Sequence, residues 1–240
     1  MKRGIFLFSA IIVLFIVPCW AQTGSGGERT VEESYLQDPL EIMIIREQAY
    51  ADSKDMKLIA LQYIKQSLDE GRGGPEIQKA LEYLATETTA TIIRSGGVGR
   101  TLNNYPDVRR EACLILGDTK TIEAKDALLK AVLGDNEPMV IAAAIRSIGK
   151  IGINEGDDVT QAISFIINRF DILNPDNSLA FESLVAFEAL ANADGGLKDP
   201  AAIRSIIKLA EGNYVTPVKI KAKDLLSKLR KMGSSSGSGK

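Results

Sequence analysis

Residues 104–118, "NYPDVRREACLILGD", and residues 136–150, "NEPMVIAAAIRSIGK", follow one outline with different letters. In both, a proline precedes an apolar segment and a glycine stands near the end of that segment. Proline suits the first turn of an α-helix because the N–H group that it lacks would be unpaired there, and glycine commonly ends helices. Each stretch therefore predicts a short helix, the first starting at Pro106 and ending at Gly117.

The same outline recurs along the chain at spacings of a few tens of residues. Each copy has a large apolar residue, a small residue four positions later and another large apolar residue four positions after that. The copies are Val108/Ala112/Leu116, Val140/Ala144/Ile148, Leu179/Ser183/Phe187 and Val218/Ala222/Leu226, and an earlier one is Met56/Ala60/Ile64. Such positions share one side of a helix, so each copy predicts an apolar stripe that a neighbouring backbone can approach closely.

A second helical stripe follows each of the first four copies in chain order. These stripes are Ile77/Ala80/Leu81/Leu84, Ala124/Ala127/Leu128/Ala131/Val132, Val159/Ala162/Ile163/Ile166/Ile167 and Ile203/Ile206/Ile207/Ala210. A single helical hairpin cannot cover its own apolar face, whereas stacked hairpins bury one another's. The sequence therefore predicts an all-α fold, an α-solenoid of about five helical hairpins over residues 38–231.

Residues 105–152 resemble the HEAT repeat in its short bacterial form, often labelled phycobilisome-lyase-like. The residues that match its outline are Asp107, Val108, Arg109, Ala112, Leu116, Gly117, Asp118, Ala127, Leu128 and Asp135. The resemblance implies the solenoid fold and a habit of binding proteins, and it implies no activity. In later copies Ile141, Ala180 and Lys219 replace the arginine, which puts in doubt a ladder of Asp–Arg contacts between units there.

The first 21 residues have the pattern of a secretory signal peptide. Lys2 and Arg3 precede an apolar run over residues 5–17, which as a helix covers only about 20 Å of the ~30 Å apolar thickness of a membrane. Small Ala21 favours cleavage after it. The alternative is lipidation of Cys19, because "IVPC" loosely resembles a bacterial lipobox, although Pro18 departs from that motif. We therefore expect an exported protein, periplasmic or else a lipoprotein.

Two segments are too poor in apolar residues to fold alone. Residues 22–37 have the glycine, serine and glutamate bias of a flexible spacer, and residues 232–240 have that of a flexible tail.

Composition removes several classes of function. The formal net charge of −2 becomes −4 once Lys2 and Arg3 leave with the leader, which argues against a nucleic-acid binder. The sequence has no histidine, which excludes histidine-based catalytic triads and histidine-ligated metal sites. Only Cys113 remains after cleavage, so no intrachain disulfide can form. We expect it to be a buried thiol in the apolar stretch "ACLIL", with Arg109 and Arg110 turned to solvent.

Two loops resemble ligand-binding loops without meeting their requirements. Residues 94–104, "RSGGVGRTLNN", lack the Gly-Lys-Ser/Thr ending of a phosphate loop, and the acidic residues at 154–161 lack the alternation of a calcium loop. We therefore expect neither a cofactor nor a metal. The glycine-rich loop still lies in an enlarged gap between copies, where Arg94 and Arg100 could meet an acidic group of a partner.

The predicted function is that of a non-enzymatic scaffold or adaptor that binds other proteins in the cell envelope through its second helices. The residues expected to face solvent there are Gln78, Lys79, Glu82, Lys125, Asp126, Lys130, Gln161, Asn168, Arg204 and Lys208. This polar, mixed-sign set favours a protein partner over a small-molecule pocket. The alternative, which rests on the resemblance alone, is a lyase-like enzyme or a chaperone acting on a bound cofactor or protein.

Charge is distributed unevenly between the two ends of the chain. Residues 28–55 contain eight acidic and three basic side chains, and residues 218–240 contain seven basic and one acidic. One interpretation is two solvated ends. The other is a basic C-terminal helix that docks on an anionic surface, either the acidic end of another copy or membrane headgroups. Apart from lipidation of Cys19, this helix is the only route to membrane contact that the sequence suggests.

Overall fold

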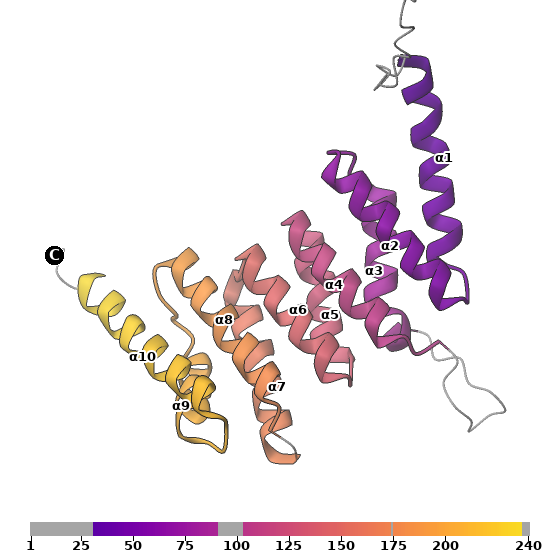
Figure 1. The fold of residues 1–240 in the computed structure, drawn as a ribbon. Helices are drawn as coiled ribbons and strands as arrows, with labels where there is room; N and C mark the ends of the chain where they lie inside the picture. Colours follow the sequence, from indigo (N-terminus) through magenta and orange to yellow (C-terminus); the bar gives the residue numbers. More distant parts are fainter. Residues whose placement is uncertain (1–30, 91–102, 174, 237–240) are drawn as a thin grey trace, which may run out of the picture. The chain divides into compact units, whose positions relative to one another are not determined.

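The computed structural model describes residues 31–90, 103–173 and 175–236, and these are all helical or loop. The ten α-helices of this part of the chain are α1 (Val31–Ala49), α2 (Lys54–Asp69), α3 (Pro75–Ala90), α4 (Pro106–Thr119), α5 (Ile122–Gly134), α6 (Pro138–Ile151), α7 (Asp158–Leu173), α8 (Asn177–Asp194), α9 (Pro200–Glu211) and α10 (Thr216–Ser236) (Figure 1). A short 3₁₀ turn, η1 (Glu155–Asp157), precedes α7. The all-α prediction is confirmed.

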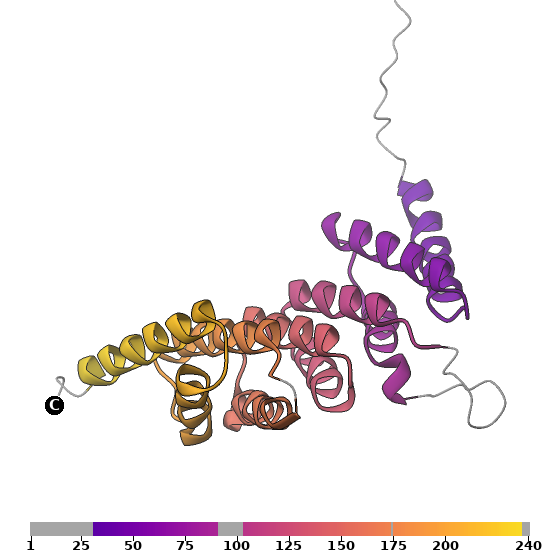
Figure 2. The same cartoon turned by 60° about the horizontal axis from the view of Figure 1, so that its bottom comes forward.

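The chain divides into two compact units, Met1–Asp38 and Pro39–Lys240, and the packing described below is that of the second. Its helices form two layers. One holds the first helices α2, α4, α6, α8 and α10, and the other holds the second helices α3, α5, α7 and α9 (Figure 2). Four complete hairpins run from α2 to α9, with α1 before them and α10 after them. This is the predicted solenoid.

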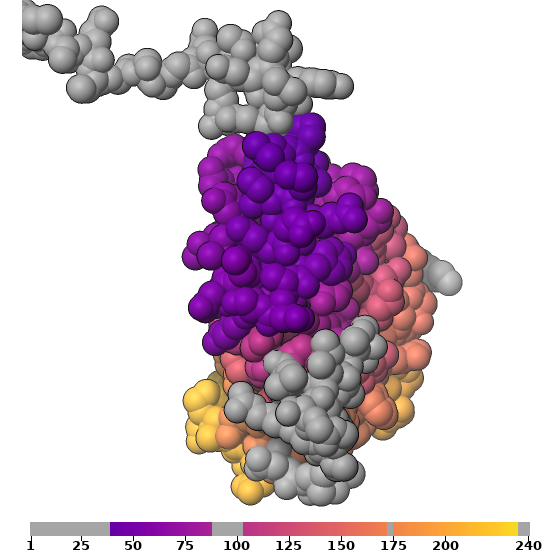
Figure 3. Space-filling view, turned by 90° about the vertical axis from the view of Figure 1, so that its right-hand side faces the viewer, coloured from indigo at the N-terminus to yellow at the C-terminus, as the bar shows by residue number. Residues whose placement is uncertain are grey.

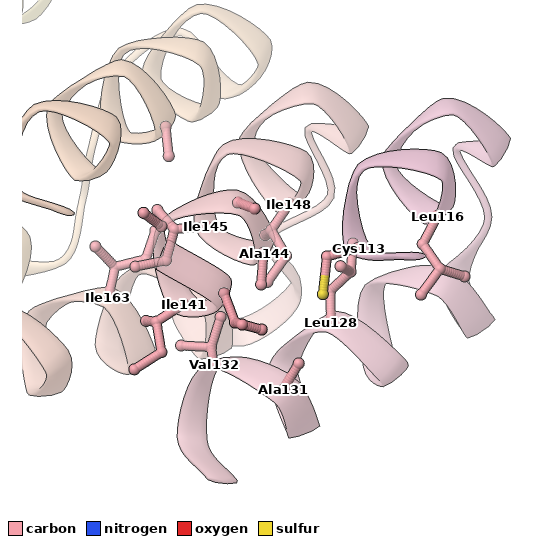
Figure 4. Close-up of a cluster of buried hydrophobic side chains, with 14 of the residues drawn as sticks. Cys113, Leu116, Leu128, Ala131, Val132, Ile141, Ala144, Ile145, Ile148 and Ile163 are labelled. Carbon is pink, nitrogen blue, oxygen red and sulfur yellow. The ribbon is translucent and has the colours of Figure 1, made fainter. Parts of the chain in front are cut away.

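The core lies between the two layers and consists mostly of the predicted stripes. Figure 4 shows this core where α4, α5, α6 and α7 meet, with Leu116, Leu128, Ile148 and Ile163 pointing into the space between the helices. In the three successive first helices α4, α6 and α8, the small and the large stripe residues are all buried. Each hairpin thus covers the apolar face of the next, as the repeat requires.

Four stripe residues are less buried than predicted. Met56 is 46% exposed, because no first helix among the described residues packs on that side of α2. Ile207 is exposed and Ile203 is partly buried, since α9 turns a face with Ile206 and Leu209 towards the core instead. Leu226 is only half-buried, because among the described residues no second helix follows α10.

Two predicted boundaries are wrong. Helix α1 begins at Val31, inside the predicted spacer, and contains Pro39. Helix α10 continues to Ser236, five residues into the predicted tail, since glycine and serine each cost less than about 1 kcal/mol in a helix relative to alanine. The rest of the spacer, the tail and the leader lies outside the described residues.

Gly117 and Gly149 do not end their helices, which continue to Thr119 and Ile151. They lie where consecutive first helices touch. A Cβ atom at Gly117 would be 2.6 Å from the Cβ of Ser147, and one at Gly149 would be 2.7 Å from the Cα of Ala186. The glycines therefore allow backbone-to-backbone contact between α4 and α6 and between α6 and α8.

Arg109 is buried, contrary to the expectation that it faces solvent, whereas Arg110 is exposed as expected. The Nε of Arg109 lies 2.7 Å from Oδ2 of Asp135, and the Nη1 of Arg109 donates to Oδ1 of Asn104 at 2.9 Å. The carboxylate of Asp135 also accepts the backbone N–H groups of the two residues that follow it. This network joins the start of α4 to the end of α5, so the arginine of the repeat acts within one hairpin.

A related buried pair occupies the first hairpin. The Nζ of Lys57 lies 3.0 Å from Oε1 of Glu87 and donates to the backbone oxygen of Ala49 at 3.0 Å. Lys57 follows Met56 as Arg109 follows Val108, so both cations stand at the same place in the repeat. At that place α6 and α8 carry the buried apolar residues Ile141 and Ala180. The position is therefore buried in each of these four first helices, whether charged or apolar.

Gly149→Ala should lower the free energy of unfolding by about 1–3 kcal/mol, because the new methyl group meets the backbone of Ala186 and the two helices must separate. The matched control is Gly233→Ala in α10, where a Cβ meets nothing within 4 Å and stability should stay equal or rise by up to about 1 kcal/mol. Urea unfolding of both variants gives the comparison. Equal stabilities would contradict the close contact.

Arg109→Met should cost about 3–5 kcal/mol, because it leaves the carboxylate of Asp135 buried without its cation. The double variant Arg109→Met/Asp135→Asn removes both charges and should recover a large part of that loss. Thermal and urea unfolding monitored by circular dichroism measure both. A single variant as stable as the original chain would show that the pair has no structural role.

Candidate protein-binding faces

The predicted partner-binding residues lie along the outward side of the second helices. Those that are exposed are Lys79, Asp126, Lys130, Gln161, Asn168 and Arg204, and those that are partly buried are Gln78, Glu82 and Lys208. We call this outward side of α3, α5, α7 and α9 the second-helix face. Arg94 and Arg100, the other two predicted contacts, lie outside the described residues.

Lys125 is the exception, because it is only 5% exposed. Its Nζ lies 2.7 Å from Oδ2 of Asp158 and 3.3 Å from Oδ1 of Asp126. The contact with Asp158 links α5 to α7. Lys125 therefore holds neighbouring hairpins together and is not available to a partner, contrary to the prediction.

Other predicted residues on this face contact one another. The Nζ of Lys208 donates to Oδ1 of Asn168 at 3.1 Å and pairs with Asp171 at 2.8 Å, joining α9 to α7. Within α3, Gln78 donates to Glu82 at 3.0 Å. The second-helix face is thus partly satisfied by its own polar contacts.

Sequence reasoning missed the apolar side chains on this face. Phe165 is 55% exposed, between the predicted residues Gln161 and Asn168 of α7. Ile122 and Leu133 of α5 are exposed as well. The signal was present for Phe165, since it falls off the buried stripe of α7 although it is large and apolar.

The outward side of the first helices α4, α6, α8 and α10, here called the first-helix face, carries a shallow groove that crosses three helices. The groove has a volume of about 120 Å³. Its lining residues are Arg110 and Leu114 of α4, Met139, Ala142, Ala143 and Arg146 of α6, and Ser178 and Glu182 of α8. Met139 of the groove is an exposed apolar residue, and the next two first helices, α8 and α10, expose Phe181 and Ile220.

Ion pairs join neighbouring first helices along their whole row. Lys54 pairs with Asp107 at 2.5 Å, and Arg146 pairs with Glu182 at 3.4 Å. The remaining links are Asp118 to Lys150 and Glu188 to Lys221 and Lys228. Hydrogen bonds from these two lysines lower the pKa of the Glu188 carboxyl below its ordinary value. Exposed pairs stabilise by less than about 1 kcal/mol each, so they orient helices that the core already holds.

A model of the family described as HEAT repeats matches residues 101–171. This segment consists of HEAT repeats. It contains α4 to α7, with the Arg109–Asp135 pair, the Gly117 contact and the groove residues of α4 and α6. The match is to HEAT repeats in general, and it does not extend to the lyase-like form that the sequence resembles. Neither the curated proteins nor the solved structures provide a match.

Cys113 lies inside the HEAT segment as a core residue. It is fully buried, and burial raises the pKa of its thiol to about 12, with the nearby negative charge of Asp135 acting in the same direction. A thiol that is both inaccessible and protonated is a poor nucleophile. This agrees with the expectation of a structural cysteine.

Nothing in the described part of the chain groups three or more potential histidine, cysteine, aspartate or glutamate ligands around one metal position. No helix among the described residues is long and apolar enough to cross a membrane.

Cys113 should resist alkylation by iodoacetamide at pH 8 while the protein is folded, because the thiol is buried and its pKa is about 12. Unfolding in urea should expose it and give rapid, complete modification. Mass spectrometry of the intact protein measures both. Fast labelling of the folded protein would place Cys113 at an open site instead of in the core.

Proposed function

We propose that the protein is a non-enzymatic, exported scaffold or adaptor that binds another protein along its first-helix face. The observation that carries this proposal is the groove across α4, α6 and α8, lined by Met139 and by two arginines, Arg110 and Arg146. Methionine, arginine and aromatic side chains are enriched at protein interfaces, and arginines often dominate their energetics. The exposed Phe181 lies on the same face.

Packing of the HEAT segment supports the first-helix face over the second-helix face. Gly117 and Gly149 bring α4, α6 and α8 into backbone contact, so successive hairpins are closest together in this layer. In a stack of hairpins the more closely spaced layer lies towards the inner side, where solenoids have their extended binding surfaces. The second-helix face, with Phe165 and Lys130, remains the second candidate.

The proposal of export rests on the first 21 residues of the sequence. A basic start, a short apolar run and a small residue at position 21 support a cleaved leader and a role in the cell envelope, with lipidation at Cys19 as the alternative. Mass spectrometry of the mature N-terminus distinguishes these. These residues lie outside the described part of the structure.

Two matched charge reversals test which face binds the partner. Arg110→Glu/Arg146→Glu changes the first-helix face, and Lys130→Glu/Arg204→Glu changes the second-helix face by the same charge at exposed positions. A partner is first recovered by cross-linking in the native envelope, and its affinity for each purified variant is then measured. We expect the first pair to weaken binding at least tenfold and the second pair to change it less than threefold.

The reverse result would assign the function to the second-helix face. Recovery of no specific partner from the envelope would contradict the scaffold itself. All four side chains are exposed, and the Arg146–Glu182 pair that the first variant loses is worth less than about 1 kcal/mol. Circular dichroism should therefore give melting temperatures within about 4 °C of the original chain, and a larger fall would disqualify the affected variant as a test.

A further inference from the structure

Helix α1 occupies the place of a second helix. It directly precedes the first helix α2, and it lies beside the second helix α3, with Ile45 and Arg46 facing Ile77 across a groove of about 500 Å³. Glu41, in the middle of α1, forms an ion pair with Arg72 in the turn between α2 and α3. The start of α3 likewise lines a groove together with the turn between α4 and α5.

This end of the stack exposes an apolar surface on which another first helix could pack, and we call such a surface a seat. On α1, Leu40, Met43 and Ile44 are exposed at positions i, i+3 and i+4, while Ile45 on the other side is buried. A helix that is apolar on both sides is typical of one covered on both sides. Figure 3 looks onto this end, where the residues of α1 from Pro39 onward form the surface.

Helix α2 contributes to the same seat. Met56, Ile59 and Tyr63 are exposed along one side of it. In the next first helix, α4, the residues at the places of Met56 and Tyr63 are Val108 and Ile115, and both are buried. The difference is that α4 has the first helix α2 before it.

The other end of the stack exposes a seat for a second helix. Leu226 is half-buried, although the residues at its place in α4, α6 and α8 are fully buried and a second helix follows each of those helices. Leu226 and Leu229 of α10 line a groove of about 450 Å³ with Leu197 and Ile203. Two cations, Lys198 and Arg230, and one carboxylate, Asp194, also line this groove, so its charged rim is net positive.

The two ends also have opposite charge. Residues 218–236 contain six basic side chains and one acidic one, whereas residues 39–55 contain four acidic and two basic. Met43 and Ile44 of α1 lie between the acidic residues Glu41 and Glu47 in the sequence, and Lys198 and Arg230 line the seat beside α10. A second helix with the chemistry of α1 therefore fits the seat beside α10 in both polarity and charge.

We propose that copies of this chain associate head to tail, with α1 of one copy seated beside α10 of the next as the second helix of a composite hairpin. In that arrangement α2 packs against α10, in the way that α6 packs against α4. At the place where Gly117 and Gly149 allow close contact, α10 has the small residue Ser227, which would face the Tyr63 position of the incoming α2.

The contact is heterologous, because the two surfaces that meet are different, and it leaves a free seat at each end of the assembly. It can therefore continue into an open chain of copies. This goes beyond the proposed function, since it would align the first-helix faces of several copies in one longer surface without requiring that a partner bind there.

Disulfide cross-linking tests the geometry on the full chain, purified in the form its host produces. Ile44→Cys/Leu229→Cys places one thiol on each proposed surface, and mild oxidation with diamide should give a ladder of dimers, trimers and larger species. The matched control, Ile44→Cys/Phe165→Cys, has its second thiol at an exposed site outside the contact and should give no ladder. Native Cys113 is buried and cannot take part.

Cross-linking by Ile44→Cys alone would indicate a symmetric pairing of two α1 surfaces and would overturn the head-to-tail proposal. Absence of a ladder from the double variant would overturn it as well.

Sedimentation velocity over a range of concentrations gives a second, independent measurement. Met43→Glu blocks one end and Leu226→Glu blocks the other, so each should weaken self-association at least tenfold. A mixture of the two should form dimers and nothing larger, because each variant keeps one intact end. A chain that stays monomeric at all concentrations, with its seats covered by its own residues or by a different partner, would overturn the proposal.

Met43 is exposed, so its replacement should leave folding intact. Leu226 is half-buried, and its replacement could unfold α10. Lys198→Glu/Arg230→Glu therefore serves as the second variant for that end, since it reverses the charge of the seat and leaves its apolar floor in place. Unchanged association in a folded Lys198→Glu/Arg230→Glu variant would remove the electrostatic part of the proposal.

Discussion

The stack depends on the close approach of its first helices at two positions where no side chain fits. At Gly117 and Gly149 even one methyl group would collide with the neighbouring helix, so the distance between hairpins is set by backbone contact. The second helices follow at wider spacing, where side chains such as Lys125 reach across to the next hairpin. The close spacing of the first helices and the side-chain contacts between the second helices therefore follow from the same constraint.

Inside the first two hairpins a buried ion pair sets the register of the two helices. Lys57–Glu87 and Arg109–Asp135 place a buried cation at the start of one helix against a buried carboxylate at the end of its partner or just beyond it. Buried ion pairs add little net stability compared with apolar residues, which agrees with Ile141 and Ala180 at the same place in later hairpins. Their value lies in penalising any misaligned pairing, because a shifted helix would leave two buried charges without partners.

The repeat itself could be predicted because its information is local. Residues four and eight positions apart share a helix face, so Val108, Ala112 and Leu116 identified a buried stripe without knowledge of the rest of the fold. The burial of Arg109 and Lys125 could not be found in this way. Their partners, Asp135 and Asp158, lie 26 and 33 residues further along the chain, and a basic side chain gives no local sign that it will be neutralised. Gly117 was misinterpreted for a similar reason, because a helix-ending glycine and a contact glycine look alike in sequence.

The row of first helices is not uniform, and this has a mechanical consequence. Where α4 and α6 carry glycine, α8 carries Glu188, which reaches Lys221 and Lys228 of α10. Contact between α8 and α10 at this place therefore runs through long side chains, whose ion pairs salt can weaken, whereas the α4–α6 and α6–α8 contacts run through rigid backbone. The buried core still joins α8 to α10, so salt should loosen this junction without separating the two helices. The middle of the row is thus held by shape, and its C-terminal junction is held partly by charge.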